Sequence, residues 1–171
     1  KTTIDGTAAR LLAADDRLFV VTSEGSIYCF GAGQGNAVVH PSAAKAPAID
    51  PTAANRAKDL LSATTTQGGY TVVWGVGDGS LVLALLQASN VYVIAVDPDA
   101  SKANALRTKL VDAGLYGRQA TVLVGTPESL ELPPYFASSM IVEDVASAGV
   151  KLEPATLKRL FTSLRPYGGA A

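Results

Sequence analysis

Tyr70-Thr-Val-Val-Trp-Gly-Val-Gly-Asp-Gly-Ser80 is the stretch of this chain that decides its fold. Tyr70–Trp74 is short, apolar and β-branched, which predicts a buried strand. Ser80–Ser89 is an apolar run that predicts a helix, so three alternating glycines stand where a strand gives way to a helix. Glycine lets the chain turn sharply and lets a ligand approach the backbone, and a helix N-terminus attracts anionic or polar groups. The stretch therefore predicts a strand–turn–helix unit with a binding site lined by backbone amides.

Helices and strands alternate on either side of this stretch. Further buried strands are expected at Val91–Val96, Ala120–Val124 and Ser138–Glu143, and further helices after the cap residue Asp50, at Ser101–Ala113 and at Pro154–Leu164. Strands that are apolar on both faces and separated by helices form a parallel sheet covered by helices on both sides. We therefore expect an α/β, Rossmann-like domain over residues 50–171. If the chain reverses direction after the third strand, the sheet order is 3-2-1-4 and a crevice opens between strands one and four.

Asp97 ends the second expected strand, 22 residues after Gly75. A carboxylate at that place can accept hydrogen bonds from both hydroxyls of a ribose. The first two strand ends thus predict a pocket for a nucleoside-bearing ligand at the carboxyl edge of the sheet. A plainer interpretation stays open, in which the glycines only permit tight helix–strand packing and Asp97 caps the turn at Pro98.

The first 35 residues have a different character. Arg17–Thr22 and Ile27–Phe30 predict two strands of a hairpin, with Gly25 in its turn and an earlier short strand at Arg10–Ala14. We expect this β-hairpin segment to end at residue 35 and a linker, which includes an exposed His40, to span residues 36–49. Cys29 alternates into a strand face and is expected to be buried.

Composition excludes several classes of protein. The 171 residues suffice for one ordinary domain, and 48% apolar against 17% charged residues indicate a packed core. The net charge of −1 argues against a nucleic-acid binder. With one cysteine and one histidine, neither a disulfide framework nor a zinc site is expected. The longest apolar runs are about six residues, far short of the roughly 20 that span a bilayer, so no membrane span is expected. The chain starts at a lysine and is expected to be a piece of a longer protein.

Residues 50–171 resemble the class I S-adenosylmethionine-dependent methyltransferases. The resemblance rests on Gly75-Val-Gly-Asp-Gly79, Val93-Ile-Ala-Val-Asp-Pro-Asp99, Val124-Gly-Thr-Pro-Glu-Ser-Leu-Glu-Leu-Pro133 and Leu164-Arg-Pro-Tyr-Gly-Gly169. The last stretch looks like the turn that precedes the fifth strand of that family. The resemblance implies S-adenosylmethionine as the cofactor and a small-molecule or protein methyl acceptor as the partner.

The resemblance also implies which residues line the cofactor site. The glycine loop would hold the aminoacyl part, the second strand end the ribose, and the third-strand loop the adenine. The residues at these positions are Gly75, Val76, Gly77, Asp78 and Gly79, then Asp97 and Pro98, then Thr126, Pro127 and Glu128. Asp78 could meet the cofactor's amine or simply cap the next helix. Glu143, at the end of the fourth strand, could position an acceptor or act as a base, with a capping or solvent-facing role as the alternative.

Four departures from the family's pattern set limits on this expectation. Val73 stands where the family usually has an acidic residue, Thr126 where it has a polar group that reaches the adenine amine, and Ala137–Ser139 where it has a Phe-Asp pair. Loss of one charged contact typically costs about 1.5–3 kcal/mol of binding. The family's sheet also has seven strands and only four are expected here, so the expected fold is truncated. Separately, no residue of the chain is a convincing catalytic base.

The segment Asp15–Gly31 resembles one hairpin of a quinoprotein-type β-propeller blade. Three functions therefore stay open. The first is a methyltransferase-like domain that binds S-adenosylmethionine, with or without catalytic competence. The second is a non-enzymatic structural or interaction module of a larger propeller protein. The third is nicotinamide dinucleotide binding, which ranks last because that fingerprint has a glycine where this chain has Ser80.

Overall fold

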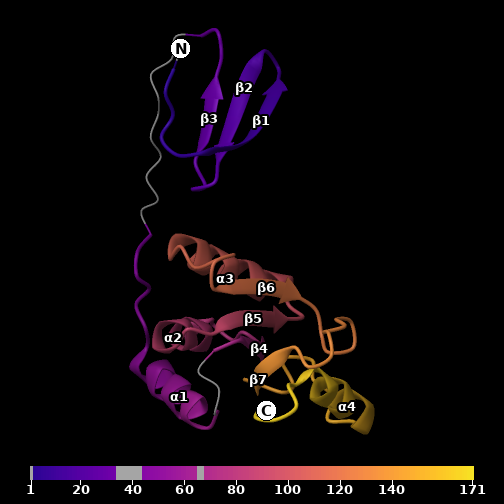
Figure 1. Ribbon diagram of the computed structural model, residues 1–171. Coiled ribbons are helices and arrows are strands. Elements are labelled where there is room, and N and C mark those ends of the chain that lie inside the picture. The colour runs from indigo at the N-terminus through magenta and orange to yellow at the C-terminus, as the bar shows by residue number, and fades with distance from the viewer. Residues whose placement is uncertain (1, 34–43, 65–67) are drawn as a thin grey trace. The chain divides into compact units, whose positions relative to one another are not determined.

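The structure is a computed structural model that describes residues 2–33, 44–64 and 68–171. The chain divides into two compact units, Lys1–Pro41 (unit 1) and Ser42–Ala171 (unit 2) (Figure 1). Both the boundary expected at residue 35 and His40 of the expected linker lie outside the described residues.

Unit 1 is a three-stranded antiparallel sheet of β1 (Ala8–Ala14), β2 (Arg17–Thr22) and β3 (Ile27–Phe30), in that order. The predicted bounds of β2 and β3 are confirmed, and β1 begins two residues before the predicted start. Gly25 turns the chain with a φ of +92°. Cys29 is exposed rather than buried. The prediction of burial was wrong because the described residues of unit 1 form a single three-stranded sheet, and no second layer covers the face that carries Cys29.

Unit 2 is built on a four-stranded parallel sheet. Its order is β6-β5-β4-β7, which confirms the predicted order 3-2-1-4. The strands are β4 (Tyr70–Trp74), β5 (Tyr92–Asp97), β6 (Ala120–Val124) and β7 (Ala137–Val142). Strands β4 and β5 end in register, since Trp74 pairs with Val96, and Trp74 also pairs with Val142 of β7. Strands β4, β5 and β7 therefore end at one edge of the sheet.

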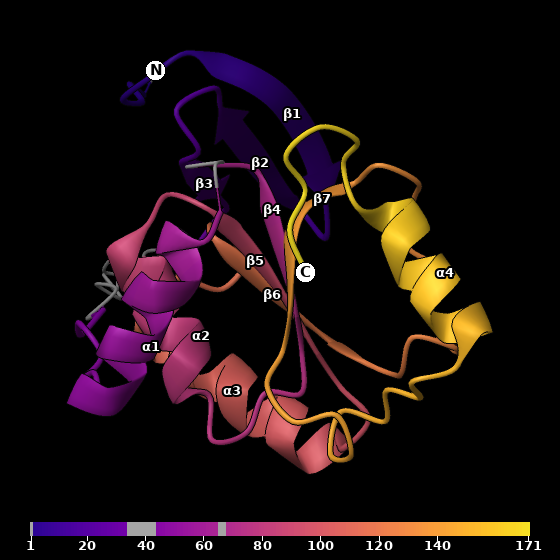
Figure 2. The ribbon, with the colours of Figure 1, turned by 90° about the horizontal axis from the view of Figure 1, so that it is seen from below.

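Four helices cover this sheet on both faces, as predicted. They are α1 (Pro51–Ser62), α2 (Ser80–Ala88), α3 (Ala100–Asp112) and α4 (Pro154–Ser163). Helices α1, α2 and α3 lie on one face, and α4 lies on the other (Figure 2). Asp50 and Asp99 begin α1 and α3 as N-caps, each accepting a hydrogen bond from the backbone N–H two residues later.

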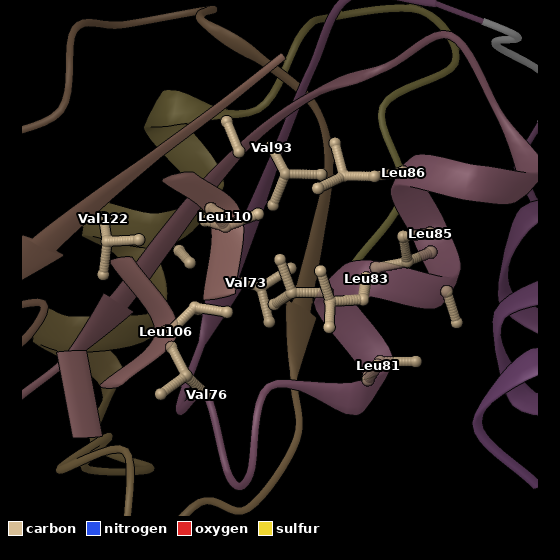
Figure 3. Close-up of a cluster of buried hydrophobic side chains, with 14 of the residues drawn as sticks. Val73, Val76, Leu81, Leu83, Leu85, Leu86, Val93, Leu106, Leu110 and Val122 are labelled. Atoms are coloured by element: carbon tan, nitrogen blue, oxygen red, sulfur yellow. The ribbon is translucent and has the colours of Figure 1, made fainter. Parts of the chain in front are cut away.

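The core of unit 2 follows from this layering. On one face, leucines of α2 and α3 pack on valines of β4, β5 and β6 (Figure 3). On the other face, Trp74, Met140 and Leu164 belong to a second buried cluster. Trp74 is 1% exposed, which confirms its predicted place in the core.

The last residues of the chain return to the sheet beside β7. The Met140 N–H donates to the Ala170 carbonyl at 2.9 Å, and the Ala170 N–H donates to the Ser138 carbonyl at 3.3 Å. Ala170 thereby forms a parallel bridge with Ser139. Within the described residues, no helix has the length and apolar character that crossing a membrane would need.

Candidate functional site

The glycine loop follows β4 at the point where the sheet order reverses. Gly75, Gly77 and Gly79 all have left-handed backbones, with φ of +79°, +51° and +86°. The Gly75 N–H donates to the Val96 carbonyl at 2.8 Å, so the loop begins while still paired to β5. This is the place at which open α/β sheets bind their ligands.

Two of these glycines also lie too close to their neighbours for a side chain. A Cβ at Gly75 would lie 3.0 Å from the Cβ of Ala148, and one at Gly79 would lie 2.9 Å from Cδ1 of Leu106. A left-handed backbone already disfavours any residue with a Cβ. Both local packing and backbone conformation therefore require glycine here, as the plainer interpretation of the loop expects.

Asp97 lies at the end of β5, as predicted, but its carboxylate points into the protein. It is 0% exposed. Its Oδ2 accepts the Val76 N–H at 2.9 Å, and its Oδ1 accepts the Asp99 N–H at 2.8 Å. The side chain thus holds the glycine loop to the start of α3, so the capping contact of the plainer interpretation is present.

A small cavity of about 160 Å³ lies beside the glycine loop, between the start of α1 and the start of α2. Glu143, at the end of β7, lines it together with Arg56 of α1. The Arg56 Nη1 lies 3.5 Å from the Glu143 Oε1. The Glu143 Oε2 is buried and has no hydrogen-bond partner among the described residues. The full lining consists of Asp50, Thr52, Ala53, Arg56, Asp78, Ser80, Leu81 and Glu143.

The charge of Glu143 is shaped by this burial. Desolvation raises the pKa of its carboxyl, Arg56 opposes that rise, and the negative charges of Asp78 and Asp144 add to it. A Cβ at Gly77 would lie 3.1 Å from the Glu143 Oε2, so the carboxylate rests against the glycine loop. The structure therefore brings Glu143 to the crevice, as predicted. Sequence reasoning missed Arg56, because nothing in the local pattern of α1 distinguishes it from a solvent-facing arginine.

Asp78 makes the contacts of a capping residue. Its Oδ1 accepts the Ser80 N–H at 2.9 Å and its Oδ2 accepts the Ser80 hydroxyl at 2.8 Å. These hydrogen bonds, with the charge of Lys109, lower the pKa of Asp78. The Lys109 Nζ also donates to the Asp78 carbonyl at 2.7 Å. Asp78 both lines the cavity and fixes the start of α2.

The residues expected beside the adenine lie close together, and one of them also reaches α4. Thr126, Pro98 and Gly149 lie together: a Cβ at Gly149 would be 3.0 Å from Cγ2 of Thr126 and 3.8 Å from Cγ of Pro98. Glu128 interacts with Thr126, and its Oε1 also accepts the Thr156 hydroxyl of α4 at 3.0 Å. Pro127 between them is buried. The described part of the chain holds no group of three or more His, Cys, Asp or Glu side chains that could bind a metal ion.

Comparisons with solved structures place this geometry in a known fold. A protein from Methanococcus maripaludis assigned to the S-adenosyl-L-methionine-dependent methyltransferases superimposes with a TM-score of 0.60 at 18% identity, over 69% of this chain and 53% of that protein. Phosphoethanolamine N-methyltransferase 2 from Haemonchus contortus, in complex with S-adenosyl-L-methionine, superimposes with a TM-score of 0.57 at 16% identity, over 67% of this chain and 26% of that one. Unit 2 has the fold of these methyltransferases.

The comparisons show the fold and leave the reaction open. The [4+2]-cyclase SpnF also superimposes, with a TM-score of 0.58 at 14% identity over 67% of this chain and 42% of that protein. One fold thus serves different reactions. The chain spans about half the length of the Methanococcus protein and about a quarter of the Haemonchus enzyme. No protein-family model matches the chain, and no curated protein matches it.

Proposed function

We propose that residues 50–171 form a methyltransferase-like domain that binds S-adenosylmethionine. The observation that carries this proposal is the loop of three left-handed glycines between β4 and α2. It lies next to the end of β7, the strand that pairs with β4. Such a loop lets a polar ligand approach the backbone closely, although the Gly75, Val76 and Gly79 N–H groups already donate within the protein. Several structures with this fold were solved with S-adenosylmethionine or S-adenosylhomocysteine bound, which supports the choice of ligand.

The cavity beside the loop matches the amino-acid end of such a ligand. Arg56 supplies a guanidinium for a carboxylate, and Glu143 and Asp78 supply carboxylates for an ammonium group. Charge-assisted hydrogen bonds of this kind are the stronger ones in proteins. Glu143 would thereby supply the negative charge that Val73 does not.

The nucleoside end of the ligand would lie at the ends of β5 and β6, over Asp97, Pro98 and Thr126. Each carboxylate oxygen of Asp97 accepts one backbone hydrogen bond and has a second lone pair to offer. A ribose hydroxyl could therefore add to these bonds without breaking them. This requires access to Asp97, which is fully buried in the structure.

Bound S-adenosylmethionine would supply a methyl group on a positively charged sulfur. The chain's own part would be to orient that ligand and to keep water from it, since positioning alone contributes much of the catalysis of bimolecular steps. The methyl acceptor, a small molecule or a protein, would enter near Glu143, at the end of β7.

A second candidate is a non-enzymatic module attached to a β-propeller, and one observation favours it. Leu11 and Leu12 are adjacent in β1 and 67% and 62% exposed. Successive residues of a strand point to opposite faces, so both faces of the unit 1 sheet present a leucine. Sheets with two apolar faces are suited to packing between neighbouring sheets, as propeller blades are.

Calorimetric titration with S-adenosylmethionine and S-adenosylhomocysteine tests the first candidate. We expect micromolar dissociation constants, which correspond to a binding free energy of about −8 kcal/mol. We expect this binding to be lost in Asp97→Ala. Asp99→Ala is the matched control, because Asp99 is the neighbouring acid but its side chain only caps α3. If no heat is detected at a ligand concentration of about 1 mM, any binding free energy is weaker than about −4 kcal/mol. The non-enzymatic module would then be the better proposal.

A further inference from the structure

The segment that follows β7 folds into a compact turn, Asp144–Val150, which we call the 144–150 turn. The Asp144 carboxylate accepts the Ser147 N–H at 2.8 Å, and the Asp144 carbonyl accepts the Ala148 N–H at 2.9 Å. The Gly149 N–H donates to the Ala146 carbonyl at 3.1 Å, and the Val150 N–H donates to the Val145 carbonyl at 3.0 Å. The hydrogen bonds that the turn forms with described residues are thus bonds within itself.

This turn lies across the ends of three strands. Ala148 is 0% exposed and packs against Gly75, the first residue after β4. Gly149, with a left-handed φ of +64°, lies against Pro98, the first residue after β5. It also lies against Thr126, which follows β6. The turn therefore occupies the edge at which a nucleoside would bind.

The buried state of Asp97 agrees with this cover. Its carboxylate lies at the end of β5, between the strand ends that the turn crosses, and no part of it reaches solvent. A ligand that approaches Asp97 from the edge of the sheet meets Ala148 and Gly149, which lie against the neighbouring residues Gly75 and Pro98.

Two buried side chains, Ala148 and Val150, hold the turn to the sheet. Ala148 contributes one methyl group and Val150, 6% exposed, packs in the cluster around Trp74, while the turn residues Asp144, Val145, Ala146 and Ser147 are exposed. One charge acts on the turn from a neighbouring element, because Lys102 of α3 attracts Asp144 and helps to lower its pKa after the larger effect of the Ser147 N–H. Since its hydrogen bonds with described residues are internal, opening of the turn costs the burial of Ala148 and Val150 but none of these bonds.

From these contacts we infer that the 144–150 turn is a self-inhibitory lid, which closes the crevice over Gly75, Asp97 and Thr126 and must swing away before a nucleoside-bearing ligand can bind. The inference concerns the same site as the proposed function and rests on it for the identity of the ligand. The opening of the turn itself is a property of the free protein. A ligand that binds only the open state has its affinity reduced by the fraction of open protein.

Thiol labelling measures the opening without any ligand. In a Cys29→Ser background, which removes the single cysteine, Ala148→Cys places a thiol on the buried side of the lid. Ala95→Cys, at a 0% exposed position of β5, is the control for global unfolding, and Ala146→Cys is the control for a freely exposed turn residue. We expect the thiol at position 148 to react at least about tenfold faster than the one at position 95 and more slowly than the one at position 146, as local opening requires. Equal rates at positions 148 and 95 would overturn the lid, whether or not any ligand binds.

A second experiment measures ligand binding to a variant in which the lid is forced open. Ala148→Asp places a carboxylate that cannot remain buried against Gly75, and Ala146→Asp adds the same charge at an exposed position of the turn. We expect S-adenosylhomocysteine to bind Ala148→Asp at least about tenfold more tightly than it binds Ala146→Asp, because the fraction of open protein rises. Fast labelling at position 148 with no binding by any variant would reject the proposed ligand and keep the lid. Binding that is equal in both variants would reject the lid and keep the ligand.

Discussion

The carboxylate of Asp97 holds the backbone of Val76, with 2.9 Å between its Oδ2 and the Val76 nitrogen. Its other oxygen accepts the Asp99 N–H, so one buried side chain ties the glycine loop to the beginning of α3. The shape of the candidate site therefore depends on the same group that we propose as the ribose partner.

Replacement of this group by an amide should destabilise unit 2. Asp97→Asn leaves one of the two backbone N–H groups facing an amide NH₂, and a buried donor without an acceptor costs about 1–3 kcal/mol. Urea unfolding followed by fluorescence of Trp74, the single tryptophan and part of the unit 2 core, measures the loss. Asp99→Asn should leave the free energy of unfolding nearly unchanged, because aspartate and asparagine are similar N-caps. Equal stability of the two variants would show that the Asp97 bonds contribute little.

The glycine at the start of α2 should tolerate substitution less well than a spatially free one. Gly79 and Gly117 both have left-handed backbones, with φ of +86° and +75°. A Cβ at Gly117 meets nothing within 4 Å, whereas one at Gly79 meets Leu106 at 2.9 Å. Gly117→Ala should cost about 1–2 kcal/mol from backbone strain, and Gly79→Ala should cost at least about 1 kcal/mol more from overpacking. The same denaturation measurement compares them, and equal losses would mean that Leu106 moves aside freely.

A buried pair of hydroxyls joins β4 to β7. The Thr71 and Ser139 oxygens lie 2.8 Å apart. Ser139→Ala should cost about 1–3 kcal/mol, since it leaves the Thr71 hydroxyl buried without that partner. The double variant Thr71→Val with Ser139→Ala should be more stable than the sum of the two single losses predicts, because it removes both polar groups. Additive losses in this double-mutant cycle would contradict the coupling.

The pH dependence of stability should carry the signature of Glu143. Its pKa is raised above 4.5 in the folded state, mainly by desolvation, so folding favours its protonated form. The stability that it contributes is present below pH 4.5 and is lost as the pH rises through the folded-state pKa. Glu143→Gln should therefore gain stability relative to the unsubstituted chain as the pH rises from 4.5 through that value.

Glu128 provides a control of opposite sign. Its pKa is lowered from 4.5, first by the hydrogen bond with Thr126. Its contribution is present above pH 4.5 and is lost as the pH falls through the lowered value. Glu128→Gln should thus approach the stability of the unsubstituted chain as the pH falls. Parallel pH profiles for the two glutamine variants would contradict both assignments.

The sheet was predictable because its strands have local signals. Tyr70–Trp74 and Ala120–Val124 were predicted with their observed bounds, and the other two parallel strands were each displaced by one residue. Runs of apolar, β-branched residues between helices determine a parallel sheet without long-range information. The N-caps Asp50 and Asp99 are local signals of the same kind: Asp50 was predicted as a cap, and Asp99 lies two residues before the predicted start of its helix at Ser101.

The arrangement of the site was less predictable, because it depends on contacts between distant residues. The place of Asp97 at the end of β5 followed from its strand, but the direction of its carboxylate depends on a hydrogen bond with Val76, 21 residues earlier in the chain. Arg56 reaches Glu143 across 87 positions of sequence, which no local pattern could reveal. Cys29 was misplaced because a strand pattern does not say how many sheets will cover it.

The exposed strand β1 also bears on how the chain behaves in concentrated solution. An edge strand presents unpaired backbone groups that can add to an edge of another molecule, and Ala8–Ala14 carries one charge among seven residues. This segment, rather than the well-covered parallel sheet, is where edge-to-edge self-association would start. A lysine in place of Leu12 should delay that aggregation without altering the core around Trp74, and the lag time before turbidity rises would record the delay.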